Sequence, residues 1–145
     1  MAFSRNSRYR VRIVFCFREE SLDLPVTRLL LVDDDPLLGM LIGDWLGEIG
    51  CEVVGPVESV AKALVLIEAE AATLDGALLD VTLREGDSYE VADALTLRGV
   101  PYAFVTGHGV DGLAPAYRRS LVLSKPFMPE DLQKMIARLL EQKVR

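Results

Sequence analysis

The sequence predicts an α/β fold in which five parallel strands form one doubly wound sheet, in the order 2-1-3-4-5, with helices on both faces. Three observations predict it. Short apolar runs alternate with segments whose hydrophobic residues recur every three or four positions. Charged residues stand at the ends of three of these runs. The chain has 145 residues, the length of a single domain that can bury a core.

The first strand and helix are predicted from residue 28 onward. Residues 28–32 are an apolar run typical of a buried strand. Asp35 followed by Pro36 is typical of a helix start, with an acidic N-cap and proline at the first helical position. Apolar residues at helical spacing then predict a helix over residues 36–49 that ends at Gly50. These apolar residues are Leu38, Leu41, Ile42, Trp45 and Ile49.

The second and third strands lie on either side of a second helix. Residues 52–54 predict a short strand closed by Gly55 and Pro56. Ser59 is typical of the N-cap of the next helix. The apolar stripe of that helix is Ala63, Leu64 and Ile67. Residues 76–80 predict a central strand, because the run is apolar on both faces.

The second half of the chain continues the alternation. A loop over residues 81–86 precedes a helix from about 87 to 98. Residues 101–105 and 120–124 predict the fourth and fifth strands. The last helix is predicted from about residue 129 to 143. Its inward-facing residues are expected to be Leu132, Ile136, Leu139 and Leu140.

The stretch between the fourth and fifth strands has an unusual composition. Gly107, Gly109, Gly112 and Pro115 fall within nine residues, which leaves room for one or two helical turns at most. We therefore expect the fourth helix to be short, mobile or missing.

Composition excludes several classes of protein. Half of the residues are hydrophobic, 26% are charged and the net charge is −6, so nucleic-acid binding through charge is not expected. The two cysteines, Cys16 and Cys51, show no metal-ligand spacing and predict reduced thiols. No apolar run approaches the ~20 residues of a membrane span. Residues 13–17 are too short for a secretory core, so we expect a cytoplasmic protein without a membrane partner.

Residues 1–25 differ from the rest of the chain. They hold five arginines against three acidic residues, whereas the remainder holds 11 basic and 19 acidic residues. They predict either a basic arm for a partner or nucleic acid, or a disordered tail or residues upstream of the true translation start; we favour the latter pair. The folded domain is expected to occupy residues 26–145.

Acidic and basic residues at strand ends predict the site. Asp33, Asp34 and Asp35 follow the first strand, Asp80 ends the third, and Lys125 comes just after the fifth. The carboxyl ends of the strands are where open α/β sheets bind ligands. Clustered carboxylates repel one another and need a cation, and an all-oxygen site suits Mg²⁺. The sequence therefore predicts a magnesium-dependent phosphoryl acceptor.

The chemistry of such a site assigns a role to each residue. Asp80 is the expected nucleophile, because a carboxylate can attack phosphorus and form an acyl phosphate. Lys125 would neutralise charge on the phosphoryl group, and Thr106, at the end of the fourth strand, would donate its hydroxyl to it. Asp35 is sufficiently explained as a helix N-cap and is not expected to touch the metal.

Over residues 28–143 the chain resembles bacterial response-regulator receiver domains, which have a CheY-like (flavodoxin-like) fold. The motifs that carry the resemblance are Leu31-Val32-Asp33-Asp34-Asp35-Pro36, Leu78-Leu79-Asp80-Val81, Thr106-Gly107 and Lys125-Pro126-Phe127. Each motif alone is weak, but four in this order, each at a strand end, are specific. The segment from Pro101 to His108 is similar to a stand-alone subgroup with a Phe-Ala-Thr-Gly signature, in which the fourth helix is poorly formed.

The resemblance implies roles for individual residues. It makes Asp33 and Asp34 the acid pair, Asp80 the phosphoacceptor, Thr106 the switch hydroxyl and Lys125 the invariant base. It also implies a magnesium ligand in the backbone carbonyl of Thr82 and a cis Lys125–Pro126 bond. Thr82 and His108 occupy positions that tune attack by water on the phospho-aspartate.

Two departures from the family pattern concern switching. The usual Pro-Gly-x-x-Gly stretch after the acceptor reads Arg84-Glu85-Gly86-Asp87-Ser88, and the aromatic switch position is Val122. An aromatic relay through residue 122 is therefore not expected. We expect ordering of the loop over residues 107–115 to replace it.

The resemblance implies a single-domain response regulator in a two-component phosphorelay. A sensor histidine kinase or a phosphotransfer protein would phosphorylate Asp80, and Mg²⁺-dependent switching would alter binding to an unknown downstream protein. Such a protein is a phosphoacceptor and not an enzyme. Only three residues follow the predicted core of the last helix, so output is expected through partner binding, competition for phosphoryl groups or relay. The sequence leaves open whether the protein forms a homodimer.

Two alternatives come from other classes. A pseudo-receiver would bind partners without phosphorylation, which the altered loop and Val122 keep open. A small phosphohydrolase of the haloacid type also uses an aspartate nucleophile with Mg²⁺. That class requires Asp-x-Asp followed by threonine, whereas Asp33-Asp34-Asp35 is followed by Pro36.

Overall fold

The computed structural model describes residues 26–144 and has the predicted sheet. Five parallel strands lie in the order β2-β1-β3-β6-β7, which is the predicted 2-1-3-4-5 order in this numbering. The strands are β1 (Arg28–Val32), β2 (Glu52–Val57), β3 (Gly76–Asp80), β6 (Tyr102–Thr106) and β7 (Leu121–Ser124). Residues 1–25, for which a basic arm or a tail was predicted, lie outside the described residues.

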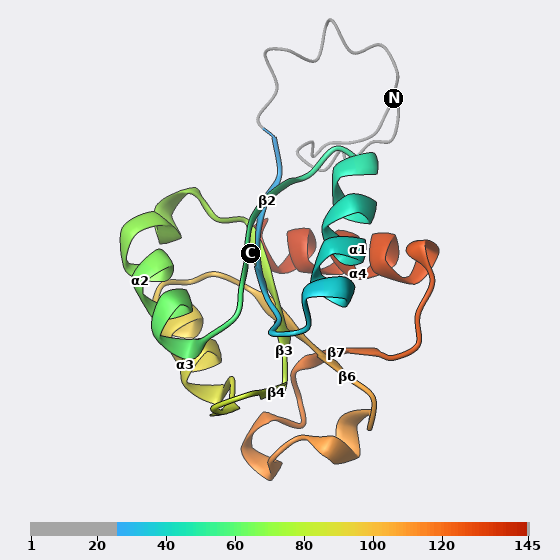
Figure 1. The fold of residues 1–145 in the computed structure, drawn as a ribbon. Helices are drawn as coiled ribbons and strands as arrows, with labels where there is room; N and C mark the ends of the chain where they lie inside the picture. Colours follow the sequence, from blue (N-terminus) through green and yellow to red (C-terminus); the bar gives the residue numbers. More distant parts are fainter. Residues whose placement is uncertain (1–25, 145) are drawn as a thin grey trace, which may run out of the picture.

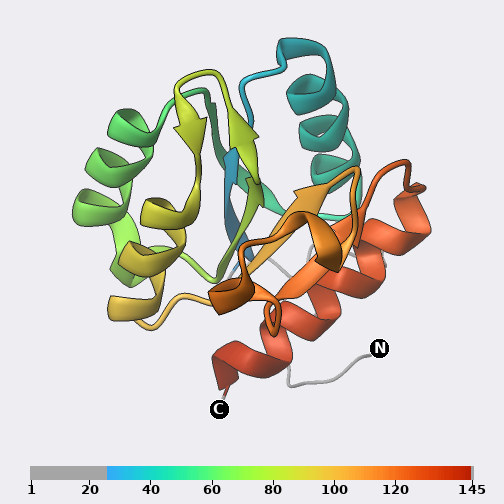
Figure 2. The same ribbon diagram turned by 90° about the horizontal axis from the view of Figure 1, so that it is seen from below.

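Helices cover both faces of the sheet and form two cores (Figures 1 and 2). The helices are α1 (Pro36–Glu48), α2 (Val60–Glu70), α3 (Tyr89–Leu97) and α4 (Pro129–Val144), with a short 3₁₀ turn, η2 (Ala71–Thr73), after α2. α1 and α4 cover one face, and α2 and α3 cover the other. All five residues of β3 are buried, as expected for a central strand covered on both faces. The sheet therefore holds β1 and β3 rigidly side by side.

The helix starts and most inward faces follow the predicted chemistry. The Asp35 carboxylate accepts hydrogen bonds from the backbone N–H groups of Leu37 and Leu38, at 3.0 and 3.3 Å. Ser59 caps α2 by accepting from the N–H of Lys62. The four leucine and isoleucine residues predicted to face inward from α4 are all at most 1% exposed. In α1, however, Leu41 is 43% exposed, and Leu46, which the prediction left out, is fully buried.

Two predicted boundaries were wrong. β2 continues through Gly55 and Pro56 to Val57, where it pairs with Val32 across an irregularity in the register. This is possible because β2 is an edge strand, where proline removes no essential ladder bond. The loop predicted over residues 81–86 contains a two-stranded antiparallel ladder of β4 (Thr82–Leu83) and β5 (Gly86–Asp87). α3 consequently begins at Tyr89, two residues later than expected.

The fourth helix of the predicted fold is reduced, as the glycine pattern indicated. Between β6 and β7 the chain makes two 3₁₀ turns, η3 (Val110–Gly112) and η4 (Pro115–Tyr117). Leu113, between the two turns, is 2% exposed and joins the core on the α2–α3 face. Among residues 26–144 no helix combines the length and the hydrophobicity that crossing a membrane requires.

We expect Gly55→Ala to lower the free energy of unfolding by about 1–3 kcal/mol. Residue 55 has a φ of +110°, and an added Cβ would lie 2.7 Å from the carbonyl oxygen of Leu31. Gly47→Ala in α1 is the control, because nothing lies within 4 Å of its added Cβ. That change should stabilise the protein by about 0.5–1 kcal/mol. Chemical denaturation measures both values, and equal effects of the two substitutions would contradict this account.

Candidate functional site

The candidate site lies at the carboxyl ends of the strands. β1 and β3 pair in parallel, with Leu31 opposite Leu78 and Val32 opposite Leu79. Asp33, the next residue after β1, and Asp80, the last of β3, therefore reach the same edge of the sheet. This edge is the lower end of the molecule in Figure 1 and faces the viewer in Figure 2. Parallel pairing thus brings together acidic residues that are 47 positions apart.

Three carboxylates form a cluster at this edge. Asp33, Asp34 and Asp80 each offer an oxygen, and these atoms all lie within 4.8 Å of one another. Asp33 is only 4% exposed and Asp80 only 8%. The N–H of Asp35 donates to Asp33 at 2.8 Å, which orients that carboxylate. Asp35 itself caps α1 and does not join the cluster, in agreement with its predicted role.

Lys125 brings a positive charge to the cluster from the loop after β7. Its Nζ lies 3.6 Å from a carboxylate oxygen of Asp80. The backbone N–H of Lys125 donates to the carbonyl of Thr106 at 2.8 Å, which ties this loop to the end of β6. The Lys125–Pro126 bond is cis, as the resemblance implied. The structure therefore places the predicted base beside the predicted nucleophile.

Thr106 is the last residue of β6 and is 4% exposed. Its hydroxyl oxygen accepts a hydrogen bond from the backbone N–H of His108 at 3.0 Å. The side chains of Thr82 and His108 are exposed, as expected for groups at a rim. Val122 is partly buried and packs against the core on the α2–α3 face.

Burial and mutual repulsion dominate the electrostatics of the acidic cluster. Burial raises the pKa of Asp33 from 3.8 to about 6, against the lowering effect of the Asp35 N–H, and the charge of Asp80 raises it further. Burial also raises the pKa of Asp80, while the charge of Lys125 lowers it and that of Asp34 raises it. One ammonium thus leaves the cluster with surplus negative charge. Such a site favours a bound cation.

Sequence reasoning missed an aromatic cluster between α3 and the stretch that joins β6 to β7. Tyr89 and Tyr117 stack with ring centroids 4.3 Å apart, and both pack edge-on against Phe104. The only signal in the sequence is four aromatic residues within 29 positions, Tyr89, Tyr102, Phe104 and Tyr117, without a common period. Only the fold brings them together.

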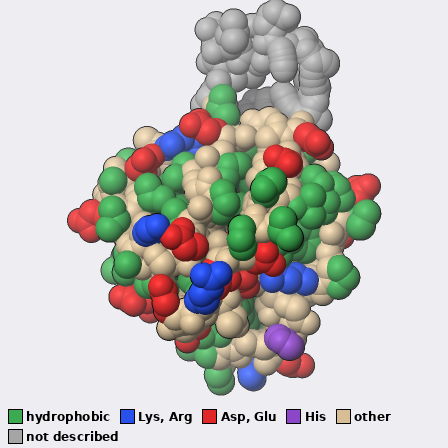
Figure 3. Space-filling model, in the orientation of Figure 1, with side chains coloured by type: hydrophobic (Ala, Val, Ile, Leu, Met, Phe, Trp, Pro, Cys, Tyr) green, Lys and Arg blue, Asp and Glu red, His purple; other side chains and the backbone are tan. Residues whose placement is uncertain are grey.

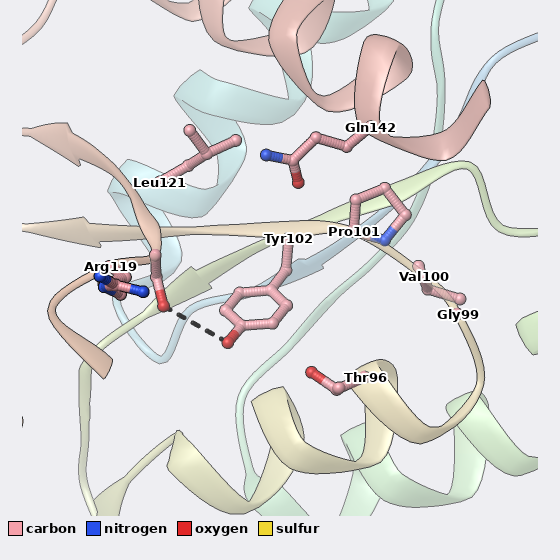
Figure 4. Close-up of a pocket in the computed structure, with 9 residues that line it drawn as sticks. Thr96, Gly99, Val100, Pro101, Tyr102, Arg119, Leu121 and Gln142 are labelled. Atoms are coloured by element: carbon pink, nitrogen blue, oxygen red, sulfur yellow. Dashed lines mark hydrogen bonds between the residues drawn. The ribbon is translucent and has the colours of Figure 1, made fainter. Parts of the chain in front are cut away.

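A pocket lies at the opposite end of the strands from the carboxylate cluster, where β6 and β7 begin (Figure 4). It is lined by residues at the starts of β6 and β7, among them Tyr102 and Leu121, and by Thr96 and Gln142 near the ends of α3 and α4.

The face shown in Figure 3 intersperses acidic and basic side chains, and hydrophobic side chains gather over α1. The carboxylate cluster at the carboxyl edge therefore remains the best-defined site among the described residues.

We expect Asp33→Asn to stabilise the metal-free protein at pH 7.5 by an amount on the order of 1–3 kcal/mol. A carboxyl whose folded pKa is raised binds its proton more tightly in the folded state. The stability that the Asp33 carboxyl contributes is therefore fully present below about pH 4 and is lost as pH rises through about 6. Asparagine cannot ionise, so it avoids this loss, and the two proteins should converge near pH 4. Denaturant titration at both pH values is the measurement.

The matched control for this prediction is Asp44→Asn, because Asp44 is an exposed residue of α1 outside the cluster. It should change stability by less than about 0.5 kcal/mol at either pH. A stability gain from Asp33→Asn that is the same at pH 4 and pH 7.5 would contradict the role of ionisation.

Comparisons with known proteins agree with this geometry. The family model of the response regulator receiver domain matches residues 29–137. The solution structure of SdrG from Sphingomonas melonis Fr1 is 39% identical with a TM-score of 0.68, over 80% of this chain and 98% of that one. The solution structure of the BeF3-activated conformation of SdrG from Pseudomonas melonis Fr1 is 39% identical with a TM-score of 0.68, over 79% of this chain and 97% of that one.

A response regulator receiver protein from Sinorhizobium medicae WSM419 is 26% identical, with a TM-score of 0.70 over 81% of this chain and 97% of that one. A search of curated proteins found no match. The resemblance predicted from the four motifs is confirmed. The chain belongs to the response regulator receiver domain family of two-component signalling.

Proposed function

We propose that this protein is a response regulator whose Asp80 accepts a phosphoryl group from a sensor histidine kinase or a phosphotransfer protein. One observation carries the proposal. Asp80 has two acidic neighbours, Asp33 and Asp34, with oxygens within 4.8 Å, and an ammonium, Lys125 Nζ, 3.6 Å away. A carboxylate in this setting can share a divalent cation with its acidic neighbours and has a positive charge beside it. Residues 26–145 are proposed to form this receiver unit.

The donor set fits Mg²⁺. Asp33, Asp34 and Asp80 supply only oxygen, and Mg²⁺ is bound through few carboxylates together with waters and phosphate oxygens. Burial raises the pKa values of Asp33 and Asp80, and repulsion between the carboxylates adds to it, so a bound cation would stabilise the charged cluster further than Lys125 does. We propose these three carboxylates and the carbonyl of Thr82 as ligands. A bound Mg²⁺ would neutralise the cluster and the phosphoryl oxygens.

Phosphoryl transfer follows from the position of Asp80. An oxygen of its carboxylate attacks the phosphorus of a phosphohistidine, so an O–P bond forms while the N–P bond breaks. The electron pair of that bond returns to the imidazole nitrogen of the donor, which takes up a proton. The product is therefore a phosphorylated signalling domain and not a turnover product.

Lys125 and Thr106 stabilise the transferred group. Lys125, already beside Asp80, compensates charge on a phosphoryl oxygen. Thr106 accepts a hydrogen bond through its oxygen from His108, so its own proton remains available for donation to the phosphoryl group. The existence of a BeF3-activated conformation of SdrG, at 39% identity, supports activation at an equivalent acidic site.

Phosphorylation at Asp80 would change the binding of a downstream protein. The two alternatives predict different outcomes for the same measurement. A pseudo-receiver would take up no phosphoryl group, and a haloacid-type phosphohydrolase would release phosphate from monoesters continuously. Profiling of phosphotransfer from candidate histidine kinases, with Mg²⁺ present and with Mg²⁺ chelated, separates them.

We expect one phosphoryl group per chain after incubation with a phosphorylated kinase or acetyl phosphate and Mg²⁺. Asp80→Asn should abolish the label, because an amide is not a nucleophile toward phosphorus. Chelation of Mg²⁺ should reduce labelling by at least about tenfold. Intact-mass spectrometry gives the stoichiometry, and the same spectrum shows whether residues 1–25 are present in the native protein.

Asp44→Asn, the exposed control in α1, should be labelled like the wild type. Labelling that survives in Asp80→Asn would place the acceptor elsewhere. Labelling that is insensitive to chelation would remove Mg²⁺ from the proposal.

Residues at the rim should set the lifetime of the phosphorylated state. Thr82 and His108 are both exposed beside the site, where water must approach in line with the O–P bond. We expect Thr82→Arg to slow hydrolysis severalfold by obstructing that approach, and Thr82→Ala to accelerate it. A bulky substitution at His108 should act like Thr82→Arg. Loss of radiolabel over time measures the rate, and unchanged decay in all three variants would exclude tuning by these positions.

A further inference from the structure

A pair of tyrosines holds the segment between β6 and β7 on α3. The ring of Tyr117, in η4, stacks on Tyr89 at the start of α3, with an interplanar angle of 17°. The hydroxyl of Tyr117 donates to Asp93 on α3 at 2.8 Å, and the hydroxyl of Tyr89 accepts from the backbone N–H of Ala114 at 2.7 Å. We call these contacts the Tyr89–Tyr117 clamp.

The clamp lies in the stretch between β6 and β7, where two 3₁₀ turns replace the fourth helix of the predicted fold. Arg118 donates to the carbonyl of Leu113 at 3.0 Å, which folds the segment on itself. The hydrogen bond to Asp93 raises the pKa of Tyr117 to about 12, because a phenolate beside a carboxylate is disfavoured. Two hydroxyl bonds and a ring stack therefore hold a segment whose only regular structure is two 3₁₀ turns. Such a segment can change its packing without unfolding a helix.

The other end of the same segment contacts Thr106. The backbone N–H of His108 donates to the Thr106 hydroxyl oxygen. Gly112 packs close to the same group, because a Cβ added there would lie 3.3 Å from Thr106 Oγ1 and 2.6 Å from His108 Cβ. The hydroxyl that the proposed function directs at the phosphoryl group is thus bonded to His108, at the start of the segment, and lies near Gly112 in η3.

Phe104 connects the two ends through the core. It lies two residues before Thr106 in β6, is fully buried, and makes edge-on contacts with Tyr89 at 5.6 Å and with Tyr117 at 6.0 Å between ring centroids. Val122, on the neighbouring strand, has no ring that could transmit a change. Tyr102, on β6 itself, also packs edge-on against Phe104 at 5.3 Å, so the aromatic contacts that reach Phe104 from outside the sheet come from α3 and η4.

We propose that the Tyr89–Tyr117 clamp is closed in the unphosphorylated protein and opens when Asp80 is phosphorylated. The segment is already held on α3 in this structure, so phosphorylation would release it, in contrast to the ordering expected from the sequence. The inference rests on the proposed function and names its regulation. If Thr106 moves to bring its hydroxyl onto a phosphoryl group, the N–H of His108 that is bonded to this oxygen moves with it, so the segment that begins at residue 107 must shift. Because coupling between two sites is reciprocal, weakening the clamp must favour the phosphorylated state.

Single hydroxyl deletions test the clamp in the full-length protein. Tyr89→Phe removes the acceptor of the Ala114 N–H, and Tyr117→Phe removes the bond to Asp93, while both keep the ring. Tyr102→Phe is the matched control, since its hydroxyl faces Ser120 at 3.4 Å in the pocket where β6 and β7 begin (Figure 4). Thermal unfolding confirms that each variant is folded.

The probe is beryllofluoride with Mg²⁺, a mimic of the phosphoryl group at an aspartate. Its apparent affinity is followed by fluorescence of Trp45, which packs edge-on against Phe127, two residues after Lys125. Tyr89→Phe and Tyr117→Phe are expected to bind the probe about two- to tenfold more tightly than the wild type, and Tyr102→Phe equally. Hydrogen exchange at the Ala114 amide should accelerate in the wild type when the probe binds.

The outcomes distinguish a failure of the proposed function from a failure of the proposed clamp. A wild type that does not bind the probe would overturn the proposed function and the clamp with it. A wild type that binds, with unchanged affinity in both clamp variants and unchanged exchange at Ala114, would overturn the clamp alone. An equal gain in affinity for Tyr102→Phe would also overturn it, because the effect would not be specific to the contacts with α3.

Discussion

The parallel pairing of β1 with β3 is the constraint on which the rest of this structure depends. It aligns β3, which ends at Asp80, with β1, which is followed by Asp33 and Asp34, and so collects three carboxylates within 4.8 Å. Like charges in a buried place oppose folding, and burial raises the pKa values of Asp33 and Asp80 accordingly. This arrangement therefore destabilises the fold locally, because it holds like charges together at the site. Cations relieve this cost, and among residues 26–144 Lys125 supplies one, 3.6 Å from Asp80.

The neighbouring residues make that cost tolerable. Asp35 directs its own carboxylate away from the cluster to cap α1, and its N–H stabilises Asp33. The loop that carries Lys125 is tied to the end of β6 by the bond to the carbonyl of Thr106. The Asp33 carboxylate and the loop that carries Lys125 are therefore held in place before any ligand arrives. Such preorganisation is what phosphoryl transfer requires, because positioning and charge compensation supply most of its catalysis.

The two faces of the sheet differ in how firmly their covering elements are held. α1 and α4 pack against their face along continuous apolar stripes, and this side resembles any rigid α/β domain. On the other face the fourth helix is replaced by two short turns, held by Leu113 and by tyrosine contacts to α3. Fewer backbone hydrogen bonds fix this segment, although it contacts Thr106 directly. The part of the fold that is easiest to rearrange is thus the part that touches the site.

The sequence by itself determined the strand order, the helix caps and the identity of the acidic cluster. These features depend on local chemistry: apolar runs, Asp35 before Pro36, Ser59 before a helix, and charges at strand ends. It also indicated the reduced fourth helix, because glycine and proline act locally. It could not place the β4–β5 ladder, the continuation of β2 through Gly55, or the exposure of Leu41.

Tertiary structure decided those features because each depends on what packs alongside. β2 continues through Gly55 because it lies at the edge of the sheet, and Leu41 is exposed because of how α1 sits on its face. The stacking of Tyr89 on Tyr117 is the clearest case. These residues are 28 positions apart, share no period and meet only because α3 and η4 flank Phe104. Contacts between distant side chains leave no pattern in a single sequence, whereas strand ends in a parallel sheet do, since the topology that brings them together is itself encoded in local periodicity.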